Sequence, residues 1–101
     1  MLMAFSGYTQ STVSGKVLDE KAENLNGATV VVSKDSRGTI LAYGISNGEG
    51  EFKVKFDSNL DSLFLKVSYI GYKTWQQKIK NKDQQLNVEL LPSSEELKRF
   101  W

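Results

Sequence analysis

Apolar residues recur at every second position along most of this chain, and that period is typical of β-strands rather than helices. The clearest example is residues 51–56, EFKVKF, in which Phe52, Val54 and Phe56 alternate with charged residues. Residues 12–18, TVSGKVL, alternate in the same way. The pattern predicts an all-β protein whose strands each bury one face.

Seven segments have this strand character, and turn-forming residues separate them. No helical period occurs before Pro92, so no helix is available to cover a single sheet, and the strands must bury their apolar faces against one another. We therefore predict a seven-stranded antiparallel Greek-key sandwich, immunoglobulin-like in kind, with a small partly open barrel as the alternative. The predicted strands are 12–18, 28–34, 39–46, 51–56, 63–70, 73–80 and 86–91.

Two of the predicted strands have a distinctive apolar pattern. Residues 28–34, ATVVVSK, are apolar on both faces, which places them in the middle of a sheet. Residues 39–46 place Leu41, Tyr43 and Ile45 on one side. If every strand buries its apolar face, this side points into the sandwich.

The sequence NGEG between two predicted strands is the strongest hairpin signal in the chain. Asn47, Gly48 and Gly50 would form this turn, because both glycines can take positive φ. Asn47 together with Glu49 and Glu51 also offers oxygen donors for calcium. Calcium takes about six to eight oxygen ligands, so three donors on one turn predict no metal site.

The stretch VSYIGYKT predicts a sharp corner at the end of an apolar strand. Gly71 would supply the bend, and Tyr72 would bury its ring while its hydroxyl bonds back to the backbone, as in immunoglobulin-like sandwiches. Tyr69 is in register with Val67 and is therefore predicted to belong to the core.

The chain contains no cysteine and no histidine. These absences exclude disulfides, Ser-His and Cys-His dyads and the usual zinc ligand sets, so we expect neither an enzyme nor a bound cofactor. The net charge is only +1 and is spread along the chain, which argues against a nucleic-acid partner. No stretch reaches the roughly 18 apolar residues that span a bilayer, so direct membrane insertion is not expected.

Charged residues gather in two places that call for an interpretation. Asp19, Glu20 and Glu23 lie in one predicted turn, where carboxylates usually form turns rather than acid-base pairs. Lysines on outward strand positions usually aid solubility and prevent edge-to-edge pairing, and we interpret them in that way. The lysines concerned are Lys53, Lys55 and Lys66.

The two ends of the chain differ in composition from the middle. Residues 1–11 are apolar and uncharged and are similar to the end of a secretory signal peptide without its basic start. A plain first strand or a disordered leader is the alternative. We therefore divide the chain into a leader or signal-peptide remnant, a folded domain over 12–91 and a tail over 92–101.

The tail carries a capping-box pattern, Ser93 with Glu96, which allows one or two helical turns over residues 94–100. Leu97, Phe100 and Trp101 would give such a helix an apolar side. This side would dock on the sandwich, result from truncation of a longer chain, or contact a protein partner.

Three stretches together carry a family resemblance: VSGKVLDEKAENLNGATVVV at 13–32, ISNGEGEFKVKF at 45–56 and LFLKVSYIGYKT at 63–74. They resemble the successive motifs of the carboxypeptidase-regulatory-like domain, a transthyretin-like sandwich. The form VSYIGYKT is most similar to the version found at the N-terminus of TonB-dependent outer-membrane transporters of Bacteroidetes. The segment SSEELK is also similar to the one that comes after the domain in those transporters, whereas RFW departs from the pattern, as in a fragment or a short relative.

The resemblance implies a noncatalytic periplasmic accessory domain of an outer-membrane nutrient transport system. Its partner would be a protein, namely the transporter plug or barrel or the energy-transducing machinery, and an exposed edge strand could also allow self-association. One alternative is a folding or regulatory domain beside a peptidase. Another is a glycan-binding module that stacks sugars on Trp75, Tyr43 or Tyr8, which loses its main support if Trp75 is buried.

Overall fold

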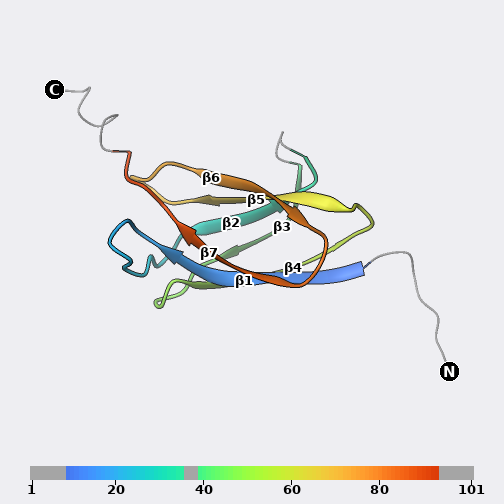
Figure 1. Cartoon of the computed structure of the whole chain (residues 1–101), viewed down its shortest axis with the longest axis horizontal. Helices are drawn as coiled ribbons and strands as arrows, with labels where there is room; N and C mark the ends of the chain where they lie inside the picture. The colour runs from blue at the N-terminus through green and yellow to red at the C-terminus, as the bar shows by residue number, and fades with distance from the viewer. Residues whose placement is uncertain (1–8, 36–38, 94–101) are drawn as a thin grey trace.

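The computed structural model describes residues 9–35 and 39–93, which form seven β-strands in two packed layers (Figure 1). The described residues contain no helix. This confirms the predicted all-β sandwich, and the predicted C-terminal helix lies outside the described residues. The strands are β1 (Thr9–Leu18), β2 (Thr29–Ser33), β3 (Ile40–Ile45), β4 (Glu51–Ser58), β5 (Ser62–Ser68), β6 (Trp75–Lys80) and β7 (Gln84–Glu89).

The strands divide into a three-stranded sheet of order β4-β1-β7 and a four-stranded sheet of order β3-β2-β5-β6. Four of the five ladders are antiparallel, as predicted, but β1 and β7 pair in parallel. A parallel pair is allowed here because a long stretch of chain connects the two strands. β1 begins at Thr9 and therefore includes the last residues of the predicted leader.

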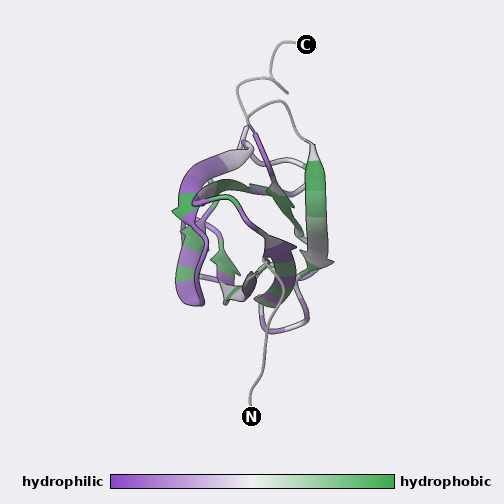
Figure 2. Cartoon of the chain, turned by 90° about the vertical axis from the view of Figure 1, so that its right-hand side faces the viewer, coloured by the Kyte–Doolittle hydropathy of each residue, from purple (hydrophilic) through white to green (hydrophobic). Residues whose placement is uncertain are grey.

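The core lies between the sheets and consists of the inward side chains of both. β4 shows the alternation that its sequence predicts, with Phe52, Val54 and Phe56 buried. Figure 2 shows such residue-by-residue alternation of hydropathy along the strands. β2 lies between β3 and β5, as predicted, and Tyr69 packs against the core while remaining partly exposed. The buried apolar residues are Val13, Val17, Leu25, Ala28, Val30, Val32, Phe52, Val54, Phe56, Leu63, Leu65, Val67, Ile79, Val88 and Leu90.

β3 is an exception to the rule that each strand buries its more apolar face. Tyr43 and Ile45 point outward and are 69% and 60% exposed, while Ala42 and Gly44 face the core. The reason is space, because a Cβ on Gly44 would lie 3.1 Å from Cγ2 of Val54 on the opposite sheet. Only small residues fit where β3 crosses β4, so Tyr43 and Ile45 face solvent, whereas Leu41, at the shift in register with β2, packs against the core.

The predicted turn at Asn47–Gly50 forms, but the strands that it joins do not pair. β3 belongs to the four-stranded sheet and β4 to the three-stranded sheet, so the turn passes the chain between layers. The Gly50 N–H donates to the Asn47 carbonyl at 2.9 Å. Gly50 has φ 77°, and a Cβ there would lie 2.8 Å from the Val17 carbonyl oxygen, so this position requires glycine. The hairpin prediction was therefore correct in its turn and wrong in its pairing.

Gly15 makes the parallel pairing of β1 with β7 possible. It lies opposite Leu86, and a Cβ on Gly15 would fall inside the Leu86 carbonyl group. Glycine inside a strand commonly marks such a close backbone approach.

Asn81, in the loop between β6 and β7, ties the two layers together at one end. Its Oδ1 accepts from the buried Ser11 hydroxyl at 2.7 Å. Its Nδ2 donates to the carbonyls of Ser58 and Leu60, each at 2.8 Å. One side chain, in the β6–β7 loop, thus joins β1, the end of β4 and the β4–β5 loop.

Candidate functional site

The corner predicted from VSYIGYKT is a tight turn over residues 69–72. The Tyr72 N–H donates to the Tyr69 carbonyl at 3.0 Å, and Gly71 takes φ 87°, a conformation that favours glycine. The rings of Tyr69 and Tyr72 pack against each other with centroids 5.7 Å apart and planes tilted by 54°. This is a favourable arrangement for two aromatic rings.

The chain that comes after β7 holds this corner on its other side. The Ser93 N–H donates to the Gly71 carbonyl at 3.0 Å, and the Lys73 N–H donates to the Leu91 carbonyl at 2.8 Å. Pro92 forms an antiparallel bridge with Tyr72. The corner is therefore held by its own turn and by the extended segment 91–93 that comes after β7.

The fixed turn presents Ile70 to solvent, and its side chain is 90% exposed. Leu91, 52% exposed, lies in the segment that bonds to the same corner. Beside Ile70 there is a shallow groove of about 390 Å³. The groove is lined by Gly27, Thr29, Ser68, Tyr69 and Ile70.

The Tyr72 hydroxyl differs from the predicted tyrosine corner. Tyr72 packs against the core as expected, but its hydroxyl makes no hydrogen bond to the backbone of the described residues. Desolvation raises the pKa of the Tyr72 hydroxyl above its ordinary value, and the carboxylates of Glu20 and Asp19 raise it further. The acidic turn is thus electrostatically coupled to the corner.

The acidic turn itself has a structural explanation. Oδ1 of Asp19 accepts from the backbone N–H of Lys21 at 2.8 Å and of Glu23 at 2.9 Å. The Ala22 N–H donates to the Asp19 carbonyl at 3.0 Å, and Ala22 takes φ 64°. The carboxylate of Asp19 is therefore used as a turn former, as interpreted from the sequence.

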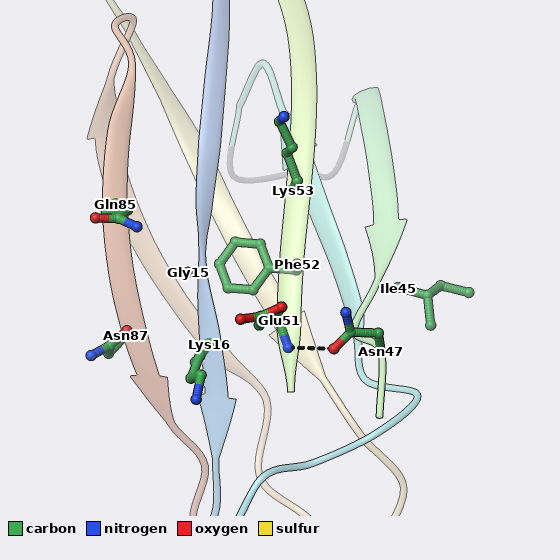
Figure 3. Close-up of a pocket in the computed structure, with 9 residues that line it drawn as sticks. All are labelled: Gly15, Lys16, Ile45, Asn47, Glu51, Phe52, Lys53, Gln85 and Asn87. Carbon is green, nitrogen blue, oxygen red and sulfur yellow. Dashed lines mark hydrogen bonds between the residues drawn. The ribbon is translucent and has the colours of Figure 1, made fainter. Parts of the chain in front are cut away.

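Asn47 is likewise committed to its turn. Its Oδ1 accepts from the backbone N–H groups of Glu49 and Glu51, both at 2.9 Å, and Figure 3 shows the bond to Glu51. An oxygen that closes two backbone bonds is poorly placed to coordinate an ion. This geometry accounts for Asn47 without a ligand.

The outer face of the three-stranded sheet forms an open polar groove of about 810 Å³ (Figure 3). Cross-strand register aligns Ser14 with Lys53 and Gln85, and Lys16 with Glu51 and Asn87. Among the described residues of this groove no aromatic side chain is available for stacking, since the ring of Phe52 belongs to the core. The groove lining is Gly15, Lys16, Ile45, Asn47, Glu51, Phe52, Lys53, Gln85 and Asn87.

The structure separates the other candidate residues. Lys53 and Lys55 lie on β4, whereas Lys66 lies on β5 in the other sheet, so the three lysines do not form one basic face. Trp75 pairs with the buried Val67, is only partly exposed and packs against the core.

Tyr43, by contrast, lies on the outer face at the far edge of the same sheet, so it shares no stacking surface with Trp75. Tyr8 and the predicted tail contacts Leu97, Phe100 and Trp101 lie outside the described residues.

The described part of the chain contains no group of three or more acidic side chains placed to hold a metal ion. Within the same residues no helix is long and apolar enough to cross a membrane. What the described residues offer as a candidate site is an exposed surface. Two features of that surface, the exposed Ile70 and the outward face of β3, depend on tertiary packing that the sequence pattern does not display.

The fold is a β-sandwich domain that exposes apolar side chains at Ile70 and on β3. The family model described as CarboxypepD_reg-like domain matches residues 13–100, and the chain belongs to this family of noncatalytic, regulatory-type domains. The resemblance to carboxypeptidase-regulatory-like domains is thereby confirmed. No curated protein sequence matches the chain.

Solved structures share the fold at low sequence identity. Hydroxyquinol 1,2-dioxygenase from Pseudomonas putida superposes with a TM-score of 0.63 at 10% identity, over 83% of this chain and 57% of that chain. The dioxygenase domain of a carbohydrate-binding fusion protein from a cellulolytic Streptomyces gives 0.62 at 10% identity, over 83% and 80%. The Bacillus anthracis TIE protein gives 0.60 at 16% identity, over 82% and 17%. The chain thus spans little more than half of the Pseudomonas dioxygenase, and the likeness establishes the fold alone.

Proposed function

We propose that the chain is a noncatalytic accessory domain of a TonB-dependent outer-membrane transport system, located in the periplasm and acting through protein contacts. Family membership supports a regulatory-type role, and the lack of histidine and cysteine argues against catalysis by this chain. The motif around Tyr69 and Tyr72 supports the link to transporters, because it is the form that resembles theirs most.

The observation that carries the proposal is the exposure of Ile70 at the centre of that motif. The turn that holds Ile70 is fixed by hydrogen bonds on both sides, yet the Ile70 side chain contributes almost nothing to the core. Single exposed apolar residues are common on protein surfaces. Here, however, Ile70 adjoins a groove on a turn held by hydrogen bonds, and Leu91 is exposed in the segment that bonds to the same corner. We propose that the transport partner binds at this Ile70 corner.

The experiment places a photo-crosslinking amino acid at position 70 in the native protein, inside cells of the native host. Position 60 serves as the matched control, because Leu60 is also exposed but precedes β5, whereas Ile70 lies after it. We expect position 70, and not position 60, to crosslink to a transporter plug, barrel or energy-transducing protein in the envelope fraction. Equal crosslinking from both positions, or crosslinks only to cytoplasmic proteins, would refute the proposal.

A further inference from the structure

The two sheets approach each other closely along one side of the sandwich and not along the other. On the closed side β3 lies against β4, and a Cβ on Gly44 would lie 3.4 Å from the Lys53 carbonyl oxygen. β6 and β7 form the edges on the opposite side, and no described strand pairs with the free side of β6. Figure 1 shows β6 as the outermost strand of its sheet. Unpaired backbone groups on such an edge can accept another strand.

A groove of about 520 Å³ follows this free edge. Along β6 the side chains alternate, so Ile79 is buried in the core whereas Lys78 and Lys80 are exposed on the outer face. All three line the groove, together with Ser62, which begins β5, and Asp61 before it. A groove lined from both faces of one strand runs along the edge of that strand. It therefore offers room for an extended segment beside β6.

The outer face at this edge carries positive charge. Lys78 and Lys80 lie on β6, and Lys66 of the neighbouring β5 lies opposite Gln76. None of these lysines makes an ion pair with a carboxylate of the described residues. β6 has no acidic residue, and Asp61 is the one carboxylate among the described residues that line the groove. Uncompensated positive charges of this kind favour a partner that brings carboxylates.

Lysine on an edge strand commonly keeps other strands away. It does so by its charge, so Lys78 and Lys80 disfavour basic or wholly apolar strands and still admit an acidic one. β4 differs in this respect, because two acidic residues accompany its two lysines. An acidic strand would therefore be repelled as well as attracted at β4, whereas at β6 the strand's own charges only attract it.

Strand pairing fixes the spacing of the acidic residues. Directly opposite residues of neighbouring strands point to the same face, so carboxylates opposite Lys78 and Lys80 must be two positions apart. The residue between them would lie opposite Ile79, on the side toward the core, where an apolar side chain fits. We propose that β6 binds an extended segment of a protein partner, in which acidic and apolar residues alternate, as a fifth strand of the four-stranded sheet.

Fluorescence anisotropy of a labelled synthetic peptide tests this binding with the full chain. The probe is a peptide of alternating glutamate and valine, and the control has the same residues in two blocks, with all glutamates first. We expect the alternating peptide to bind at least about tenfold more tightly, because its spacing sets carboxylates opposite both lysines and apolar residues toward the core. Equal binding of the two peptides would overturn the proposal, since charge alone would then suffice.

Charge reversal locates the site on β6. K78E/K80E should weaken binding of the alternating peptide about tenfold or more, because attraction becomes repulsion. K53E/K55E reverses two lysines of the same spacing on β4, in the other sheet, and should change the affinity by less than about twofold. Circular dichroism checks that both variants are folded. An equal loss of affinity in the two variants would place the binding elsewhere and overturn the proposal.

N-methylation of the peptide tests whether its main chain pairs with β6. Alternate N–H groups of an added strand point to its neighbour, so methylation of either the glutamate or the valine nitrogens must weaken binding. If neither methylated peptide binds more weakly than the parent, no strand is added. Single-stranded DNA of equal charge that binds as tightly, and is lost in K78E/K80E, would also overturn the proposal, because the edge would then bind polyanions in general.

This edge differs from the Ile70 corner, so the inference goes beyond the proposed function and does not depend on it. Ile70 is not part of the groove, and K78E/K80E should leave crosslinking at position 70 unchanged. Leu60 precedes Asp61 at one end of the groove. A crosslink from position 60 that K78E/K80E removes would therefore report the acidic partner rather than the transporter, which separates the two proposals.

Discussion

The outer face of the three-stranded sheet is polar on every strand, whereas the four-stranded sheet exposes Tyr43 and Ile45 on its edge strand β3. In Figure 3 the Ile45 side chain points away from the polar residues of β1 and β7. Both sheets share one core, and the lack of space beside Val54 leaves room only for small inward residues on β3. The four-stranded sheet therefore exposes large apolar side chains at this edge, whereas the outer face of the three-stranded sheet is mainly polar. The polar outer residues are Ser14, Lys16, Glu51, Lys53, Gln85 and Asn87.

The largest loss of stability is expected from Gly15→Ala, which should disrupt the three-stranded sheet with the polar outer face. The new Cβ would overlap the Leu86 carbonyl, so β1 and β7 would have to separate. We expect a loss of at least about 3 kcal/mol in the free energy of unfolding, or failure to fold. Urea denaturation measures it, with Gly48→Ala as the control, since nothing lies within 4 Å of a Cβ there. Equal stability of the two variants would contradict the close approach.

Removing the hydrogen bonds of the Asn81 side chain should have the next largest effect on stability. Asn81→Ala removes three hydrogen bonds and leaves the buried Ser11 hydroxyl without its acceptor. We expect a loss of about 2–3 kcal/mol, measured by thermal and urea unfolding. Asn87→Ala on the polar outer face is the matched control and should change stability by less than about 0.5 kcal/mol. If the two variants lose the same amount, the Asn81 hydrogen bonds do not join the layers.

A gain in stability is expected from a substitution in the turn that connects β1 of the three-stranded sheet to β2 of the four-stranded sheet. Ala22 takes φ 64°, which glycine adopts without strain. Ala22→Gly should therefore raise the free energy of unfolding by about 0.5–1 kcal/mol. Substitution of Glu20, which is exposed in the same turn, by glycine serves as the control and should give no gain. A lower melting temperature for Ala22→Gly would show that the left-handed conformation is not present.

The smallest change in stability, and the sharpest test of the comparison, comes from the charged edge. K53V/K55V removes both lysines from the outer face of β4, where Glu51 and Asp57 remain, and leaves its buried residues unchanged. Stability should change by less than about 0.5 kcal/mol, but loss of the two lysines should allow this edge to pair, so that sedimentation velocity shows larger species than for the wild type. If the variant sediments like the wild type, lysine is not what keeps this edge unpaired.

Much of the fold could be predicted because the local alternation of apolar and polar residues indicates where strands form. β4 shows this best, since each of its apolar residues is buried as its sequence implies. The sheet partners could not be predicted in the same way. Asn47 and Gly50 specify a turn, but whether the strands beside it pair depends on which layer each strand joins.

The candidate contact surfaces were only partly visible in the sequence for a similar reason. Gly71 and Tyr72 marked the corner, yet the exposure of Ile70 results from the turn geometry and from the segment that bonds to Gly71. The outward orientation of β3 results from the lack of space beside Val54, and Gly44 was the only signal of it. The close approach at Gly15 likewise joins strands that are distant along the chain.

The parallel pairing of β1 with β7 affects how the domain resists a pulling force. If force acts on β1 at Thr9 and on β7 at Glu89, the two strands are drawn past each other along their length. The hydrogen bonds across all six register pairs, from Val13 with Gln84 to Leu18 with Glu89, then share the tension and must fail together. An antiparallel pair pulled in this way would peel apart one bond at a time. The sandwich should therefore transmit a pull between these two points with high resistance to rupture.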